Sequence, residues 1–377
     1  MNLMSSHKKL ANLIAVNLLL GSFLIYDPVK IVRYVLSLLL QLTALFFIST
    51  KPISNPGRST KAVGRYAYIL FLIFTIFIVF KLIGADDTDI INRVLPLISM
   101  YGFYIFTDSR LNIEPKIISN TFVKLYIILA LIVDIDSILN IATGMSLWPP
   151  ISWLGLRYCG PFGDPNFLAL FSAVVFIYII YSDKDDIPKK YYSLAILFVN
   201  ILLTQSFSTF AYIPISILLY KYTRRFSNIK KQIIFLVIYF TFISLYAALD
   251  KQIEKFVVEI LYKILGSYDL AYLKYGSLQI RLDTQAEAMR IFVSEWWGQG
   301  PRQLVPQLEH DTHNSYISMM FEQGIMGLLL ILATLKGGCV TKRENIIGTY
   351  LMLSAFLLNV HDTTIYSFFV LMQKRNN

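Results

Sequence analysis

The stretch "DTHNSYISMMFEQGIMGLLLIL", Asp311 to Leu332, begins with polar residues and then becomes an apolar run. A helix of roughly 20 apolar residues matches the hydrocarbon thickness of a bilayer. Similar runs recur along the 377 residues, of which 56% are hydrophobic and only 15% are charged. The sequence therefore predicts an all-α fold, a polytopic membrane bundle of about twelve transmembrane helices in a single integral membrane domain spanning residues 1–377.

The expected spans follow the apolar runs of the chain. The first run follows a basic lead, and no small-residue cleavage site comes after it, so we expect a retained helix rather than a signal peptide. No internal repeat or linker indicates a second domain. The runs centre near residues 10–26, 31–50, 66–83, 94–107, 121–139, 166–182, 192–204, 208–220, 232–249, 313–335, 345–360 and 363–372.

The positive charge is distributed as in a membrane protein. A net charge of +10 would suggest nucleic acid in a soluble domain, but much of it lies in short loops such as "KYTRRFSNIKK" and "KGGCVTKRE". The positive-inside rule assigns these loops to the cytoplasm, so no nucleic-acid partner is implied. It leaves residues 140–165 and 250–312 as loops on the opposite, outer side of the membrane. Cys159 and Cys339 then lie on opposite sides and cannot form a disulfide.

The outer loop 250–312 carries many cations for a segment on that side, including Arg281, Arg290 and Arg302. Long loops translocate regardless of charge, so solvation and anchoring at the interface are one interpretation. The other is that some of these cations hold an anionic phosphate group at the outer face. Within the loop, "SLQIRLDTQAEAMRIFVSEWW" predicts an amphipathic helix lying on the bundle, with Arg281 and Gln285 away from an apolar stripe formed by Leu282, Ala286, Met289, Val293 and Trp296.

The helix expected from residue 313 carries two glycines. Gly324 and Gly327 follow His313 by 11 and 14 positions, so in a continuous helix both lie within about 40° of its azimuth. Small residues there let a neighbouring helix approach closely and hold His313 toward the bundle. The alternative is an ordinary packing helix with a polar cap.

The outer loop 140–165 leads into the next span through "WLGLRYCGPFGDPNFLALFSAV". The expected span follows directly after Asp164, Pro165 and Asn166. A helix start explains this stretch, because proline disfavours helical structure at the residue before it and because Asp or Asn caps helices. Arg157 is either a solvated loop cation or a guanidinium suited to bidentate phosphate binding.

Together these pieces resemble the O-antigen polymerase and ligase superfamily of bacterial envelope glycan assembly. "HNSYISMMFEQGIMG" fits the superfamily's H-N-x9-G-x-x-G pattern from His313 and Asn314 to Gly327. "LRYCGPFGDPN" is similar to its Arg, Gly and Pro-Asn segment before a span. "QIRLDTQAEAMRIFVSEWWGQGP" is similar to its Arg-bearing loop helix, which a Gly-Pro turn follows.

The resemblance implies a GT-C-like bundle in the bacterial inner membrane, with the active site facing the periplasm and the substrate a glycan on undecaprenyl diphosphate. It implies Arg157 and Arg281 as ligands of the diphosphate and His313 as the residue near the attacking hydroxyl. Guanidinium groups stabilise such a leaving group without a metal or cofactor, and His313 accepts the hydroxyl's proton. Further substrate-binding candidates are Asn314, Asp164, Asn166, Arg290 and Arg302. Candidate partners are membrane lipid, a chain-length regulator and a flippase.

One position departs from the resemblance. Many relatives have an Arg in the segment that corresponds to "LTQSFSTFAYI", where this chain has Phe207. His310 is a candidate partial substitute, although a loop role explains it as well.

Three functions stay open. The first is a repeat-unit polymerase for O-antigen, capsule or exopolysaccharide, and the second is a ligase acting on lipid A-core by similar chemistry. The third is a lipid-linked oligosaccharide flippase or other transporter, for which Lys124, Asp134 and Asp136 are intramembrane candidates. The cations of interest lie outside the spans, which favours catalysis at the interface over transport.

Overall fold

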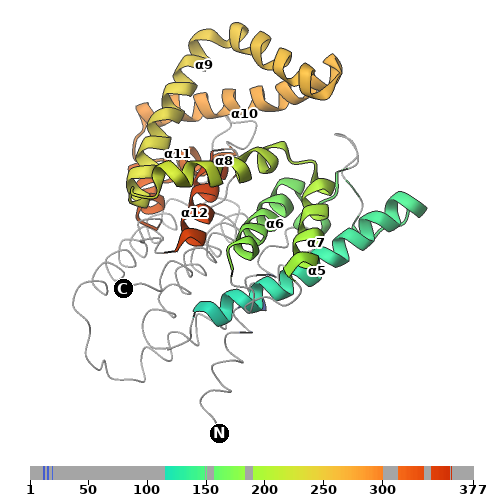
Figure 1. The fold of residues 1–377 in the computed structure, drawn as a ribbon. Helices are drawn as coiled ribbons and strands as arrows, with labels where there is room; N and C mark the ends of the chain where they lie inside the picture. The colour runs from blue at the N-terminus through green and yellow to red at the C-terminus, as the bar shows by residue number, and fades with distance from the viewer. Residues whose placement is uncertain are drawn as a thin grey trace, which may run out of the picture.

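A computed structural model of the chain describes residues 115–148, 150, 157–182, 190–299, 313–334, 341–356 and 358, with four isolated residues near the N-terminus. Within these ranges every regular element is a helix (Figure 1). The elements are α5 (Pro115–Thr143), the 3-10 helix η1 (Gly160–Phe162), α6 (Pro165–Ile180), α7 (Lys190–Thr204), α8 (Phe207–Thr223), α9 (Asn228–Leu265), α10 (Tyr268–Ser294), α11 (Ser315–Thr334) and α12 (Lys342–Ser354).

The α-helices other than α10 and the second part of α9 coincide with the apolar runs expected between residues 121 and 360, which agrees with a helical bundle. The runs expected between residues 31 and 107, and the last at 363–372, lie outside the described residues. No single described helix has both the length and the hydropathy that a membrane span requires. One bent pair, Lys230–Tyr246 with Lys251–Leu265, meets both conditions when its two parts are taken together. The membrane topology therefore stays a prediction.

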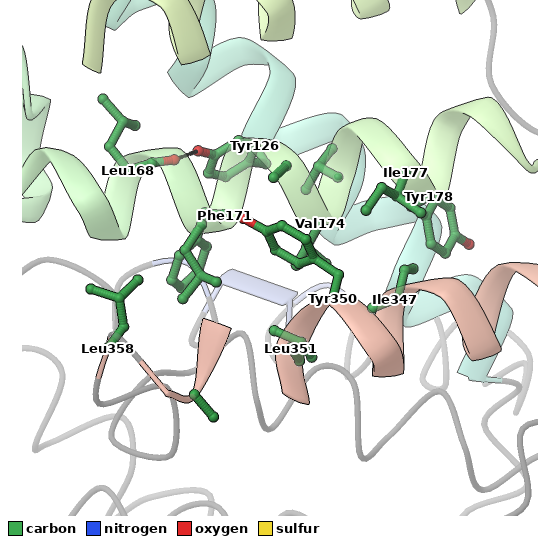
Figure 2. Packing of buried hydrophobic residues seen from close by; sticks show 14 of the residues in the cluster. Tyr126, Leu168, Phe171, Val174, Ile177, Tyr178, Ile347, Tyr350, Leu351 and Leu358 are labelled. Carbon is green, nitrogen blue, oxygen red and sulfur yellow. Dashed lines mark hydrogen bonds between the residues drawn. The ribbon is translucent and has the colours of Figure 1, made fainter. Parts of the chain in front are cut away.

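Helix α6 forms the centre of the main core. Its sequence is apolar on all sides, as expected for a helix buried by neighbours on every face. Figure 2 shows Phe171 and Val174 of α6 near Tyr350 of α12, with Tyr126 of α5 close by. The Tyr126 hydroxyl donates to Leu168 O at 3.2 Å, which joins α5 to α6.

Helix α9 departs from the expected loop structure. Its backbone is non-helical at Leu249, where the helix bends by 109°. The part after the bend runs back along α10, and the two form a helical hairpin with a small core of Val258, Ala271 and Tyr275 (Figure 1). The expected loop 250–312 is thus helical over most of its described part, rather than a loop with one amphipathic helix.

The buried face of α10 also differs from the expectation. Leu282 is buried as expected, but Val293 is 76% exposed and Trp296 is 49% exposed. The buried face follows Leu282, Gln285, Ala288 and Ile291 instead. The helix ends at Ser294, so the periodicity cannot extend to Trp296. Gln285, expected on a different side from Leu282, is fully buried because its amide has a hydrogen-bond partner on α9.

Helix α11 is not continuous through its glycines. Gly324 has φ 65° and ψ −156°, a conformation outside the helical region. His313 itself precedes the helix, with φ 47°. The expected common face of His313, Gly324 and Gly327 assumed an unbroken helix from residue 313, and this geometry is wrong for that reason.

The break in α11 accommodates the turn that follows α10. Ile325 N donates to Trp296 O at 3.1 Å, and Gln299 N donates to Phe321 O at 2.8 Å. A Cβ on Gly324 would lie 2.4 Å from Trp296 O, so only glycine fits this close backbone approach. Gly327 is crowded by a different atom. A Cβ at Gly327 would lie 2.3 Å from Met319 O, which belongs to the same helix.

Two groups of polar residues lie at opposite ends of α6. The Arg157 end comprises Arg157, Asp164, Asn166, Thr204 and Ser206, where α6 and α8 begin and α7 ends. The Arg343 end comprises Ser182, Lys190, Lys342 and Arg343, where α6 ends and α7 and α12 begin. The charge pattern assigned these groups to the periplasmic and cytoplasmic sides, respectively.

Candidate active site

Arg157 is fixed in place by two hydrogen bonds at the Arg157 end. Its side chain is only 7% exposed. Nε donates to Thr204 O at 3.0 Å, and one terminal nitrogen donates to Asn166 Oδ1 at 3.1 Å. The rigid planar fork of a guanidinium makes such directional pairs while its other N–H groups remain to meet a ligand. Arg157 is therefore anchored between α6 and α7.

Asp164 and Asn166 combine a structural role with this anchoring. Asp164 is the N-cap of α6, and its Oδ1 accepts a hydrogen bond from Asn166 N at 2.7 Å. Asn166 Oδ1 accepts from Arg157 and also from Ser206 Oγ, at 3.2 Å. The helix-start interpretation of the "DPN" stretch is confirmed, and the same residues position the arginine.

Arg281 of α10 belongs to the same electrostatic neighbourhood. Burial lowers the pKa of the Arg281 guanidinium, and the charge of Asp164 opposes that shift. Burial also lowers the pKa of Arg157, with Asp164 again opposing and the positive charge of Arg281 adding to the decrease. The two arginines therefore repel each other across a site in which Asp164 is the carboxylate acting on both.

An arginine pair of this kind favours an anion. Among the described residues, the buried guanidinium of Arg157 and the half-buried guanidinium of Arg281 lie near the Asp164 carboxylate, in a medium where charges interact strongly. A bound phosphate or diphosphate accepts bidentate hydrogen bonds from such groups and removes the repulsion. The arrangement can thus stabilise negative charge that develops on a leaving group.

His313 lies at the start of α11 in a strained backbone conformation. Among the described residues other than glycine, only His313 (φ 47°) and Gln205 (φ 49°) have positive φ. Gln205 precedes Ser206 at the Arg157 end. Strained residues of this type persist where the surrounding structure holds them, and they cluster at functional sites.

Asn314 serves mainly as a structural residue. Its Oδ1 accepts hydrogen bonds from Tyr316 N at 3.0 Å and Ile317 N at 3.1 Å, as an N-cap residue does. Its Nδ2 donates to Phe356 O at 3.3 Å, beyond the end of α12. The side chain is fully buried, so the structure gives Asn314 a role in positioning His313 rather than an open face for substrate.

A polar chain links this helix start to α10. The Tyr239 hydroxyl of α9 donates to Gln285 Oε1, and it also interacts with the Asn314 side chain. Gln285 lies one helical turn after Arg281 on α10. Tyr239 and Gln285 thereby couple the arginine-bearing helix to the segment that holds His313. The sequence contains no marker for a role of Tyr239 in this chain, because an aromatic residue in an apolar run indicates packing.

Three expected site residues lie elsewhere or cannot be placed. Arg290 is paired with Glu287 at 2.6 Å on the exposed surface. It follows Arg281 by nine positions, which places it about 180° around the helix. Arg302 and the alternative His310 lie outside the described residues.

The two carboxylates considered for transport have structural partners. Asn200 Nδ2 donates to Asp134 Oδ1 at 3.0 Å between α7 and α5. Asp136 accepts from Leu147 N at 2.6 Å and Trp148 N at 3.2 Å, which fixes the segment after α5. In the described ranges, no three His, Cys, Asp or Glu side chains gather in a way that could hold a metal ion.

Comparison with known proteins supports the resemblance of the motifs. Residues 192–332 match a family model described as O-antigen ligase, a segment that contains Arg281, His313 and both glycines of α11 but not Arg157. No curated protein and no solved structure matches the chain. The family supports glycosyl transfer of the O-antigen ligase or polymerase type in general. Through residues 192–332 the chain is thus a match to the O-antigen ligase family, consistent with the O-antigen polymerase and ligase superfamily.

Proposed function

We propose that the protein is a repeat-unit polymerase of the bacterial inner membrane. It transfers a growing glycan from undecaprenyl diphosphate to a lipid-linked repeat unit at the periplasmic face. The observation that carries the proposal is the buried guanidinium of Arg157, which Thr204 O and Asn166 Oδ1 hold in place and whose pKa is lowered by burial and by the charge of Arg281. An active site for this donor has to hold a diphosphate without a nucleotide-binding loop, and a guanidinium pair provides that contact.

The proposed chemistry divides the roles among three residues. The bond between the anomeric carbon and the diphosphate oxygen breaks, and a new bond forms from that carbon to the acceptor hydroxyl oxygen. Arg157 and Arg281 stabilise the negative charge that develops on the departing lipid diphosphate. His313 takes the proton of the acceptor hydroxyl as the new bond forms.

A ligase is the second candidate, and the matching family model, which is described as O-antigen ligase, supports both reactions in general. The ligase would use the same donor and the same leaving group, but its acceptor would be a sugar of lipid A-core. Arg157 and Arg281 support either reaction, because the polymerase and the ligase would release the same lipid diphosphate. The acceptor therefore distinguishes the two candidates.

The test is a gel of envelope glycans from a strain lacking the gene, with undecaprenyl-linked intermediates measured in parallel. The polymerase proposal expects core bearing a single repeat unit and no ladder. Long chains that persist on the carrier lipid beside bare core would establish the ligase. Single units that accumulate on the cytoplasmic side would overturn both and indicate a flippase. Complementation with Arg157→Ala, which should fail, connects the phenotype to the site.

A further inference from the structure

The turn between α7 and α8 supplies both contacts that hold Arg157. Thr204 O accepts a hydrogen bond from Arg157 Nε directly, at 3.0 Å. Ser206 acts through Asn166, because its Oγ donates at 3.2 Å to Asn166 Oδ1, the same oxygen that accepts from Arg157 at 3.1 Å. Gln205, between Thr204 and Ser206, has φ 49°, which residues other than glycine rarely adopt. Arg157 is thus anchored from a strained turn, a feature that clusters at functional sites.

Ser206 is the N-cap residue of α8, but its side chain does not cap the helix. A serine at this position ordinarily accepts a hydrogen bond from a backbone N–H two or three residues later, and this bond stabilises the helix. Ser227 does so at the start of α9, where its Oγ accepts from Lys230 N at 3.4 Å. The Ser206 hydroxyl contacts Asn166 instead. Helix capping therefore does not explain the serine at position 206.

The hydroxyl groups around Ser206 direct its proton toward Asn166. Thr209 Oγ1 donates to Ser206 Oγ at 3.2 Å, and Ser208 Oγ lies 3.2 Å from the same oxygen. Ser206 is 1% exposed and Thr209 is 2% exposed, so water competes little for these bonds. A hydroxyl has one proton to donate and two lone pairs that accept, so Ser206 can accept from both neighbours while it donates to Asn166. The Asn166 amide is then held with its oxygen toward Arg157.

We propose that Ser206 is a positioning residue for glycan transfer: its hydroxyl fixes the Asn166 amide, and the amide oxygen fixes the guanidinium of Arg157. The inference rests on the proposed function, in which Arg157 contacts the departing lipid diphosphate. Ser206 itself touches no reacting atom. Neither the motif resemblance nor the description of the matching family assigns it a role.

The experiment compares Ser206→Ala and Ser206→Cys with the wild type and with the control Ser227→Ala, all in lipid nanodiscs. The position of Arg157 is followed by its rate of modification with the arginine reagent phenylglyoxal, quantified by peptide mass spectrometry with Arg343 as the internal reference. The kcat and KM of glycan transfer and the melting temperature are measured on the same preparations.

Loss of one hydrogen bond implies that both Ser206 variants label Arg157 about three- to tenfold faster, with Arg343 unchanged. Cysteine nearly keeps the shape of serine but is a weak donor, so it should resemble alanine. We expect kcat to fall by a similar factor and KM to change less, because the charge on the leaving group develops in the transition state. Ser227→Ala should lower the melting temperature and change neither labelling nor kcat.

Unchanged labelling of Arg157 in Ser206→Ala, or equal acceleration at Arg157 and Arg343, would overturn the positioning role. Wild-type behaviour of Ser206→Cys would overturn it too, because the effect would then belong to side-chain volume. Labelling also separates this inference from the proposed function. Faster labelling of Arg157 alone supports the positioning role even where the wild type transfers no glycan, a result that would overturn the proposed function. Wild-type labelling in Ser206→Ala overturns the positioning role even where transfer is observed.

Discussion

The two ends of α6 both gather cations, but they use them in different ways. At the Arg343 end, Lys190 Nζ donates to Ile180 O and Ser182 O at 2.9 Å each, where α6 terminates. Arg343 donates to Ser182 Oγ at 3.0 Å and lies 4.2 Å from the ring centroid of Tyr178. Cations placed at a helix C-terminus stabilise its unpaired carbonyls and its dipole. These cations therefore interact with the protein itself.

At the Arg157 end the cations oppose one another. Arg157 and Arg281 each lower the stability of a neighbouring positive charge, and Lys274 is affected by both. A fold that retains mutual repulsion at a buried place has a reason other than its own stability. The comparison shows that the number of cations does not identify a binding site. What favours an anion at the Arg157 end is a buried arginine held by Thr204 O and Asn166 Oδ1, with a second arginine whose charge lowers its pKa.

The largest expected effect is the loss of the anchored arginine. Arg157→Ala should reduce glycan transfer by about a hundred- to a thousandfold, because it removes a donor that stabilises the leaving group. Arg157→Lys should not restore transfer, since a lysine cannot bond Thr204 O and Asn166 Oδ1 while facing a ligand. Arg290→Ala, on the opposite side of α10, is the control and should transfer normally. Transfer is measured in membranes with matched protein amounts.

The second prediction concerns His313. His313→Asn should reduce transfer by about a hundredfold or more, because it removes the group that accepts the hydroxyl's proton. Asparagine tolerates the left-handed backbone found at this position, so the thermal stability should change little. Transfer and melting temperature are measured on the same preparation. Normal transfer by His313→Asn would exclude His313 from proton transfer.

The third prediction tests the contact that joins α10 to α11. Gly324→Ala should destabilise the protein by about 1–3 kcal/mol through backbone strain alone, because its φ and ψ belong to a region that glycine alone occupies. The matched control is Gly276→Ala inside α10, where a Cβ would have nothing within 4 Å. That change should stabilise the helix by about 0.5–1 kcal/mol.

Thermal unfolding in detergent distinguishes the two glycines. A melting temperature that falls for Gly324→Ala and is equal or higher for Gly276→Ala agrees with the close approach of Trp296 and Gly324. Equal changes of the melting temperature for Gly324→Ala and Gly276→Ala would contradict this close approach.

The smallest expected effect is at the Arg343 end. Lys342 Nζ lies 4.8 Å from the ring centroid of Tyr181 and 5.6 Å from that of Tyr220. An exposed cation–π pair contributes about 0.5–1 kcal/mol, so Lys342→Ala should lower stability slightly. Transfer per folded molecule should not change. A large loss of transfer at constant protein amount would mean that the two ends are functionally linked.

The sequence predicted what depends on local patterns. Apolar runs located α5 to α8, the first part of α9, α11 and α12, and Asp164-Pro165-Asn166 predicted the start of α6, because caps and hydrophobic periodicity are local properties. The loop residues Arg157 and Arg281 were identified by resemblance, and the structure brings them together.

What the sequence missed depends on tertiary contacts. The break at Gly324 arises because the turn at Trp296 approaches its backbone, and that contact joins segments far apart in the chain. The buried position of Gln285 depends on Tyr239 of another helix.

The most direct test of the account is transfer by purified protein in vesicles supplied with undecaprenyl-diphosphate-linked repeat units. Glycan length and released undecaprenyl diphosphate are measured together for the wild type, Arg157→Ala and Lys342→Ala. We expect the wild type and Lys342→Ala to lengthen the glycan and release the carrier in step, and Arg157→Ala to do neither. Normal lengthening and release by correctly folded Arg157→Ala would contradict the claim that the Arg157 end is the active site.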